Sequence, residues 1–410
     1  MQPKLITLDS GITAILVPCE AESVAVGIFV ASGSRHESPK FAGISHFIEH
    51  MLFKGTPTRR AIDIIRAIEG RGGNFNAYTS EESTCFFAHL PDDYLLDAID
   101  ILCDMYLNAS IDPEEFEKEK RVIIEEIRMY RDEPESVAAE NLQRAIFPRN
   151  QLGAPIAGSE ESLLPLTPDD LHDYINRHYL ASKTVIVISG SFKESKAISK
   201  LNAVLPKGIR KAPSFKTPKV DFSIPPVHEI IVKKEVNQTQ LMLGYRTFGC
   251  LDERKYPAAV LDGILGRGMS SRLFQEVREK YGLSYDIGSR WQFFKDAGML
   301  SIGAGVDPGK AAIALEVINK EIDRLVQKRL TPADLKRTKE YLIGNFRISN
   351  EKALTKMLFY AGNYLSQGRL VLPSEQIEKV REVTADQVRD VARAIFSADN
   401  SALSWVMPKE

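Results

Sequence analysis

Apolar and polar residues alternate along residues 12–18 and 24–33, and again along residues 228–236 and 239–249. A period of two places successive side chains on opposite faces of a strand, so each of these stretches predicts a β-strand. Segments with helical periodicity follow the strands in each half of the chain. The pattern predicts an α+β fold with two antiparallel-rich mixed sheets, each with helices packed on one face.

The helical segments of the two halves repeat one another. Residues 90–130 predict a helix, a short break and a long second helix that begins at Pro113. Residues 306–346 have the same layout, with Pro332 at the start of the long helix. An internal duplication of this kind predicts two homologous domains in one chain.

The end of each half follows a second shared pattern, in which a short helix leads into a strand. Thr167 precedes the helix in the first half, and Thr384 precedes it in the second. Both threonines are predicted N-caps, and Asp170 and Gln387 lie three residues on, where capping-box partners are expected.

A proline-rich segment separates the two halves. Residues 206–226 contain five prolines and no sustained apolar period, which is typical of an extended linker. We therefore predict an N-terminal domain over residues 1–205 and a C-terminal domain over residues 227–410, with the linker between them.

Composition excludes several classes of partner. The chain has 53 basic and 55 acidic residues, well mixed, so no global charge would recruit nucleic acid or an anionic membrane. The first residues lack the basic and apolar regions of a secretory signal, and no apolar run reaches the length of a membrane span. The four cysteines form no Cys-x-x-Cys pair, which favours reduced thiols and a cytoplasmic location.

The stretch "AGISHFIEHMLFKGT" at residues 42–56 contains two of the seven histidines in the chain. A helix over residues 43–53 would place His46 and His50 one turn apart on the same face, with Glu49 beside them. Two imidazoles in this arrangement can bind one zinc ion, and a catalytic zinc needs a third protein ligand from elsewhere. The alternative is that they are core or surface histidines with no shared role.

The duplication provides an internal test of the metal hypothesis. The second half reads "LDGILG" where the first half reads "SHFIEH", and it has Thr338 and Asn345 where the first half has Glu119 and Glu126. The half without the histidines therefore also lacks the acids. Glu119 and Glu126 are seven residues apart and share a helix face, so we predict Glu126 as the third ligand and Glu119 as a carboxylate that holds a ligating imidazole. The alternative for this glutamate-rich stretch is a solvated helix face.

With these motifs, the sequence resembles the M16 (pitrilysin/insulinase) family of zinc metallopeptidases, in its shorter bacterial and mitochondrial-processing-peptidase-like branch. The resemblance covers nearly the whole chain. It rests on the inverted zincin motif from His46 to His50, on Glu126 at 76 residues beyond His50, and on the stretches "GGNFNAYTSEEST" and "SSRLFQEVREKYGLSY". It implies two homologous α+β domains and an enclosed chamber formed when two such pairs face each other, so a homodimer is expected and a heterodimer is an alternative.

The resemblance also implies roles for further residues. An edge strand beside the metal would pair with the substrate backbone through Asn76, Ala77, Tyr78 and Thr79, and the alternative is a turn. Arg278 and Tyr285 would contact substrate from the opposing half, and the alternative is a surface arginine and a packing tyrosine.

The predicted activity is hydrolysis of unfolded peptides, with one Zn²⁺ per chain and Glu49 as the general base. Two other interpretations stay open. The chain could be a catalytically idle, peptide-binding scaffold subunit, or it could be the active half of a heterodimer.

Overall fold

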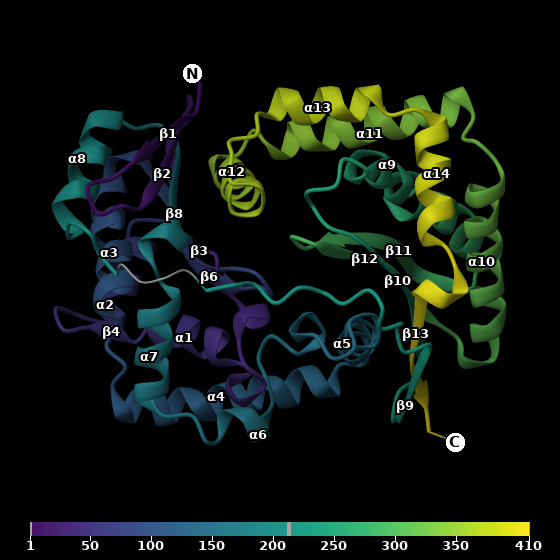
Figure 1. Cartoon of the computed structure of the whole chain (residues 1–410), viewed down its shortest axis with the longest axis horizontal. Coiled ribbons are helices and arrows are strands. Elements are labelled where there is room, and N and C mark those ends of the chain that lie inside the picture. Colours follow the sequence, from purple (N-terminus) through teal and green to yellow (C-terminus); the bar gives the residue numbers. More distant parts are fainter. Residues whose placement is uncertain (1, 211–214, 410) are drawn as a thin grey trace. The chain divides into compact units, whose positions relative to one another are not determined.

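The computed structural model describes residues 2–210 and 215–409 (Figure 1). Residues 211–214, which fall within the predicted linker at 206–226, lie outside the described residues. The chain divides into two compact units. Unit 1 comprises Met1–Arg128, Ala154–Pro218 and Ser349–Leu370, and unit 2 comprises Met129–Gly153, Lys219–Ile348 and Val371–Glu410.

Unit 1 is built on a six-stranded sheet in the order β1-β2-β8-β3-β7-β6. Only the pair β2–β8 is parallel, and all the other neighbours are antiparallel. The last strand in this order, β6, forms one edge of the sheet. The strands are β1 (Lys4–Thr7), β2 (Thr13–Pro18), β3 (Ser23–Val30), β6 (Asn74–Thr79), β7 (Thr84–Pro91) and β8 (Thr184–Gly190).

The sheet of unit 2 has the order β11-β12-β10-β13-β9 and repeats the same pairing. The pair β13–β9 is parallel, like β8–β2 in unit 1, and the other neighbours are antiparallel. The edge strand β11 thus occupies the position of β6, which confirms two homologous domains of mixed, antiparallel-rich sheet. The strands are β9 (Glu229–Lys234), β10 (Thr239–Phe248), β11 (Ser284–Phe293), β12 (Ala297–Val306) and β13 (Ser401–Pro408).

Most helices of each unit cover one face of its sheet, as the sequence pattern predicts. Their apolar side chains and the inward side chains of the strands form the main core of each unit. The helices of unit 1 on this face include α1 (Ile44–Leu52), α2 (Ala61–Glu69), α3 (Leu95–Asn108), α7 (Pro168–His178) and α8 (Glu194–Val204), joined by most of α4 (Pro113–Asp132). In unit 2 they are α9 (Lys255–Gly266), α10 (Ala311–Gln327), α13 (Pro373–Glu382) and α14 (Ala385–Ile395), together with α11 (Pro332–Ser349).

One further helix covers the opposite face of each sheet, and it comes from the other half of the sequence. Helix α12 (Ala353–Gln367) packs against β3 and β8 of unit 1, and α5 (Pro134–Ile146) packs against β10 and β13 of unit 2. A Cβ atom at Gly244 would lie 2.8 Å from the side chain of Leu142, so the helix packs closely on the sheet where the strand has no side chain. The units therefore depart from the contiguous ranges 1–205 and 227–410 at these two helices.

The predicted helix caps are confirmed. The Thr167 side chain accepts a hydrogen bond from the backbone N–H of Asp170, and Thr384 does the same for Gln387, each within a capping box. None of the helices in the described parts of the chain has the length and apolar character needed to cross a bilayer.

Candidate metal centre

Helix α1 presents an apolar face to the core and a polar face with the predicted ligands. Its side chains Phe47, Ile48 and Met51 are buried in the core of unit 1. His46 and His50 lie on another face one turn apart, with ring centroids 4.6 Å from each other. The amphipathic pattern of this short helix therefore fixes where the imidazoles point.

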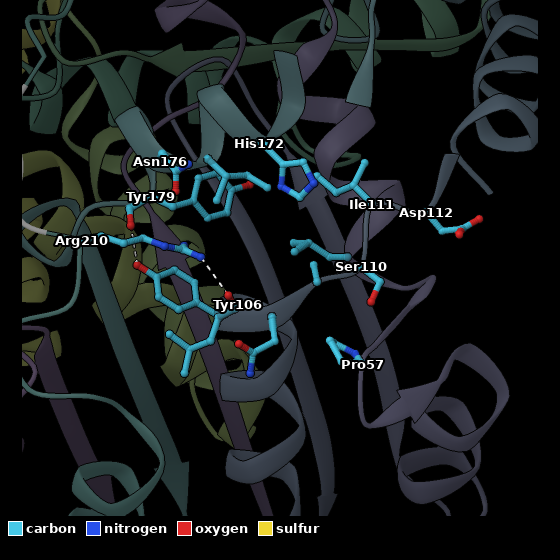
Figure 2. A pocket seen from close by; sticks show the side chains of 14 residues that line it. Pro57, Tyr106, Ser110, Ile111, Asp112, His172, Asn176, Tyr179 and Arg210 are labelled. Atoms are coloured by element: carbon cyan, nitrogen blue, oxygen red, sulfur yellow. Dashed lines mark hydrogen bonds between the residues drawn. The ribbon is translucent and has the colours of Figure 1, made fainter. Parts of the chain in front are cut away.

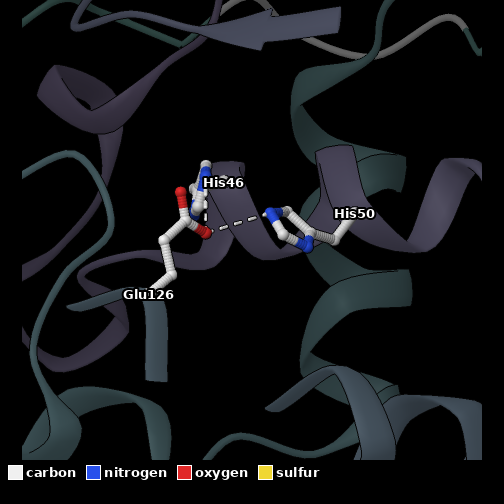
Figure 3. A group of neighbouring side chains, drawn as sticks. All are labelled: His46, His50 and Glu126. Carbon is white, nitrogen blue, oxygen red and sulfur yellow. Dashed lines mark ion pairs between the residues drawn. The ribbon is translucent and has the colours of Figure 1, made fainter. Parts of the chain in front are cut away.

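Helix α4 brings the third side chain to the two histidines. Phe116 of α4 stacks on Phe47 of α1 with ring centroids 4.6 Å apart, which fixes one helix against the other. An oxygen of Glu126 then lies 3.5 Å from Nε2 of His50 and 3.9 Å from Nε2 of His46 (Figure 3). Potential ligand atoms of the three residues all lie within 4.8 Å of one another. This is the one group of three such side chains found in the described parts of the chain.

Glu119 occupies the position expected of a carboxylate that orients a ligating imidazole. The Nδ1 atom of His50 donates to Oε2 of Glu119 at 3.0 Å, which leaves Nε2 of the same ring directed toward Glu126. The ammonium of Lys54 forms an ion pair with the other oxygen of Glu119. Although burial opposes it, these hydrogen bonds from His50 and Lys54 hold the pKa of Glu119 below its usual value.

The two histidines differ in the charge that their surroundings favour. Burial, followed by the charge of His50, lowers the pKa of His46 to about 4, so this imidazole is neutral at neutral pH. Burial also disfavours charge on His50, but hydrogen bonds to Glu119 and Glu126 outweigh it and raise the pKa of His50 to about 9. The carboxylates thus attract a positive charge to this point, and in the absence of a metal a proton provides it.

This donor set fits zinc. Two imidazole nitrogens and one carboxylate oxygen are the ligands of a three-residue catalytic zinc site, which keeps one position open. A carboxylate that holds the ligating imidazole is also typical of such sites. His46, His50 and Glu126 could hold the ion, with Glu119 fixing the orientation of His50.

Glu49 lies beside this group and carries a raised pKa. Burial is the main cause, and a hydrogen bond from Thr79 partly offsets it. The Thr79 hydroxyl donates to Oε2 of Glu49 at 2.5 Å, so the last residue of β6 orients this carboxylate. A carboxylate whose pKa is shifted toward neutrality by burial is suited to accept a proton during catalysis.

The remaining residues of the predicted edge strand lie on β6. Asn76 and Tyr78 are exposed, while Ala77 and Thr79 are partly buried on the alternate face. Within the described sheet, β6 has a partner strand on one side only, β7. The structure thus places Asn76–Thr79 on a sheet edge that ends at Glu49.

Arg278 and Tyr285 belong to unit 2 and lie close together there. The guanidinium of Arg278, on the π-helix Phe274–Lys280, lies 4.5 Å from the centre of the Tyr285 ring at the start of β11. The Tyr285 side chain is 79% exposed and lines a pocket of about 740 Å³ on the sheet of unit 2. The two residues are thus a surface pair rather than part of the core.

The two histidines of α7 take no part in the metal group. Figure 2 shows His172 in the wall of a separate pocket of about 470 Å³, together with Tyr106 and Arg210. His178 instead contacts Ser32, whose Oγ lies 2.9 Å from Nδ1 of the ring. Their separate surroundings agree with the spacing of six residues, which is unsuited to a shared ion.

Sequence reasoning did not identify two contacts of the site. Lys54 follows the end of α1 and carries no local signal that it will meet Glu119 on a different helix. Thr79 was expected to bind substrate through its backbone, whereas its hydroxyl also holds Glu49. Both contacts join segments far apart in the sequence, so only the tertiary structure reveals them.

A two-domain fold with a His-x-x-Glu-His helix is typical of one class of protein, the inverted-motif metallopeptidase. Comparison with known protein families supports this class. Residues 15–160 match the family described as Insulinase (Peptidase family M16), and residues 165–342 match the Peptidase M16 inactive domain. The chain belongs to peptidase family M16.

Individual relatives support this membership. A Bacillus subtilis protein named "Uncharacterized zinc protease YmxG" is 36% identical over 389 residues, covering 94% of this chain and 93% of the relative. A Mycobacterium leprae protein, also named an uncharacterized zinc protease, is 33% identical over 396 residues, covering 95% of this chain and 88% of that protein. The crystal structure of a protease from Helicobacter pylori shares the fold, with a TM-score of 0.92, 20% identity and coverage of 99% of both chains.

Proposed function

We propose that this chain is a zinc-dependent endopeptidase that hydrolyses unfolded peptides, with one Zn²⁺ per chain and Glu49 as the general base. The observation that carries the proposal is the group of His46, His50 and Glu126, whose potential ligand atoms lie within 4.8 Å of one another beside Glu49. Membership of family M16 and the zinc protease names of the relatives support it.

When bound by these three residues, zinc would supply Lewis acidity, polarising the scissile carbonyl and lowering the pKa of a water molecule. The protein contributes the arrangement around it. Glu119 holds the His50 ring through Nδ1, so that Nε2 is presented to the ion. The pKa of His46 is lowered by burial, so its ring needs no deprotonation before it binds.

Glu49 moves the proton in the proposed reaction. Its carboxylate would accept a proton from the attacking water as the water adds to the peptide carbonyl, and would then donate that proton to the leaving amine. The hydrogen bond from Thr79 fixes Oε2, which leaves the other oxygen for the water. Burial raises the pKa of Glu49, which brings its proton affinity closer to that needed for both steps.

The edge strand β6 is the proposed binding site for the substrate backbone. A peptide that adds to the free edge at Asn76–Thr79 would form main-chain hydrogen bonds, which require an extended segment but few particular side chains. This favours unfolded peptides or short polypeptides of varied sequence as substrates. It also directs the peptide toward Glu49, because Thr79 at the end of the strand contacts that carboxylate.

Arg278 and Tyr285 are proposed to contact substrate from the second unit. Tyr285 is exposed beside a pocket in unit 2, and the partly exposed Arg278 lies over its ring, so a peptide could reach both. We propose that two copies of the chain enclose a chamber, with this pair serving the active site of the partner copy. A strictly monomeric protein with full activity would contradict this part of the proposal.

The cytoplasmic location stays a prediction.

Two other functions remain as alternatives. A scaffold subunit would bind peptides without cleaving them, and the active half of a heterodimer would need a different partner chain. The complete set of His46, Glu49, His50 and Glu126 favours an active subunit over a scaffold. Copurification from the native host would separate a homodimer from a heterodimer.

The test is cleavage of a mixed set of unstructured peptides by the zinc-loaded protein and its Glu49→Gln variant. The variant is expected to retain zinc and to lose activity by about a thousandfold or more, because the base is removed while the ligands stay. The matched control is Glu125→Gln, which changes a neighbour of Glu126 that is exposed and paired with Arg128. It should retain full activity.

Each outcome has a defined meaning. Activity in the parent that is abolished by Glu49→Gln and by a chelator would support the peptidase. An active parent whose Glu49→Gln variant is equally active would contradict the assigned base. No cleavage by the parent, with zinc bound, would contradict the proposal for this chain alone and favour a binding role or a missing partner.

A further inference from the structure

The start of helix α1 has an unusual N-cap. The N-cap residue is Gly43, with φ of 93°, and no side chain at this position accepts a hydrogen bond from the helix. A Cβ atom at Gly43 would lie 2.5 Å from the backbone oxygen of Ala157. The serine, threonine or aspartate that usually caps a helix therefore cannot occupy this position.

Glu37 provides the missing cap from six residues upstream. Its Oε2 accepts a hydrogen bond from the backbone N–H of Gly43, and its Oε1 accepts one from the backbone N–H of Ser45, each at 2.8 Å. The side chain is almost fully buried, with 4% exposure. The two N–H donors lie on either side of Ile44, the first residue of α1, and Ser45 directly precedes His46. The helix dipole favours a carboxylate at this end of the helix.

A chain of buried hydroxyl groups continues from this cap. The hydroxyl groups of Ser45 and Tyr174 lie 3.0 Å apart, and the Tyr174 hydroxyl also lies 3.2 Å from that of Ser32. Ser32 follows strand β3 and in turn contacts His178, whose ring stacks on Tyr174 at a centroid distance of 3.8 Å. Through this network the first turn of α1 is linked to α7 and to the central part of the sheet.

We propose that Glu37 is a positioning residue of the metal centre, which fixes the first turn of α1 so that His46 is held ready to bind the ion. The inference rests on the proposed function, because it assumes that His46 is a zinc ligand. Glu37 accepts hydrogen bonds from the backbone N–H groups of Gly43 and Ser45, so it acts on His46 through the backbone that directly precedes this residue. A cap that served only to stabilise the fold would have no separate effect on the affinity of the folded protein for zinc.

The chemistry of the cap sets the effect of a substitution. Glu37→Gln retains the shape of the side chain, but its amide NH₂ would face one of the two backbone N–H groups, which leaves a buried donor without an acceptor. The first turn would then adopt several conformations, and His46 would lose part of its preorganisation. Substitutions that loosen the support of a metal ligand commonly weaken binding by about tenfold or more.

The experiment measures the zinc dissociation constant of the full-length protein by competition with a chromophoric chelator, together with the melting temperature of the metal-free protein. Glu37→Gln is expected to raise the dissociation constant about tenfold. Tyr174→Phe removes one hydroxyl of the network and serves as a milder variant should Glu37→Gln fail to fold. It is expected to raise the constant about threefold, since Ser45 keeps its backbone bond to Glu37.

The matched control is Thr384→Ala, which removes a helix cap from α14 in unit 2. It should lower the melting temperature without changing zinc affinity. If Glu37→Gln and Tyr174→Phe lower the melting temperature but leave the dissociation constant equal to that of the parent, the positioning role is wrong. If the parent itself binds no zinc, it is the proposed function that fails.

Discussion

The two units carry the same pair of helices but use them differently. In unit 1, α1 and α4 present His46, His50 and Glu126 to one point. In unit 2, the corresponding positions of α9 and α11 carry Asp262, Gly266 and Asn345. The strand orders match, so the fold does not depend on the metal ligands.

The charge of Asp262, at the position in unit 2 that corresponds to His46, is paired within the unit. Asp262 is fully buried, forms an ion pair with Arg267 and accepts a hydrogen bond from Ser289 at 2.6 Å. A Cβ atom at Gly266 would lie 2.3 Å from the backbone nitrogen of Ser289, so no histidine fits there. In contrast, the carboxylates around His50 in unit 1 attract a proton or a cation. This difference agrees with a metal site in unit 1 and none at the corresponding positions of unit 2.

The strongest test of this comparison is His50→Ala. Because it removes a ligand, we expect zinc binding to be lost and peptide cleavage to fall by about a thousandfold or more. Zinc per chain after dialysis and the rate of peptide cleavage provide the two measurements. Asp262→Asn, at the position that corresponds to His46, should retain both, and loss of zinc in that variant would contradict the assignment to unit 1.

The ionisation of Glu37 is expected to make the stability of unit 1 depend on pH. Burial, opposed by hydrogen bonds from Ser45 and Gly43, raises the pKa of Glu37 to about 7 in the folded chain, against 4.5 for the ordinary group. A group with a raised folded pKa contributes stability that is full below pH 4.5 and is lost as the pH rises through 7. Between pH 4.5 and pH 7, the free energy of unfolding of the parent should therefore fall by about 3 kcal/mol relative to that of Glu37→Gln.

Urea unfolding of the metal-free parent and of Glu37→Gln across this pH range measures that difference directly. Because the comparison is between two variants, the titration of the histidines cancels. Parallel pH profiles for the two proteins would show that Glu37 does not titrate in this range.

Glu119→Gln examines the support of His50. The substitution weakens the acceptor of the His50 Nδ1–H bond and removes the charge that pairs with Lys54. We expect zinc affinity to fall about thirtyfold, with zinc still bound at saturating concentration. Thr338→Ser, at the corresponding position in unit 2, is the control. An unchanged affinity in Glu119→Gln would show that the carboxylate does not orient the ring.

Asp262→Asn should have a smaller effect, and on stability alone. The asparagine retains an oxygen that can accept the hydrogen bond from Ser289, but it lacks the charge opposite the half-exposed Arg267. We therefore expect the free energy of unfolding to fall by about 1.5 kcal/mol. The midpoint of urea unfolding measures this. A variant more stable than the parent would contradict a stabilising role for the Asp262–Arg267 ion pair.

The smallest effects concern elements that the two units share. Thr167→Ala and Thr384→Ala each remove the same capping bond, and each should destabilise its unit by about 1 kcal/mol. Urea unfolding of the two variants side by side tests this. Clearly unequal losses would show that the matching sequence patterns do not imply matching energetics.

The sequence predicts well those features that depend on local signals. Pro113 and Pro332 begin their helices as predicted, and both threonine caps form. The His46 and His50 pair follows from helical spacing, and the loss of both histidines and acids from the second half points to a shared site. The proline, cap and histidine signals lie within a few residues of the features that they specify, whereas Glu126 was predicted from the comparison of the two halves.

The features that were not predicted depend on contacts between distant segments. The runs of buried side chains in β3 and β10 are compatible with helices on both faces, but nothing in them indicates that α12 and α5 come from the other half of the sequence. In the same way, the cap from Glu37 depends on the left-handed turn at Gly43 and on the nearby backbone of Ala157. No periodicity in the sequence records such contacts.

The central claim is that one metal ion is held by unit 1 alone. The most direct measurement is anomalous diffraction at the zinc absorption edge from crystals of the zinc-loaded protein. The account predicts one strong peak per chain, between Nε2 of His46, Nε2 of His50 and the carboxylate of Glu126, and no peak near Asp262. A peak elsewhere, or none at this group in zinc-loaded crystals, would contradict it.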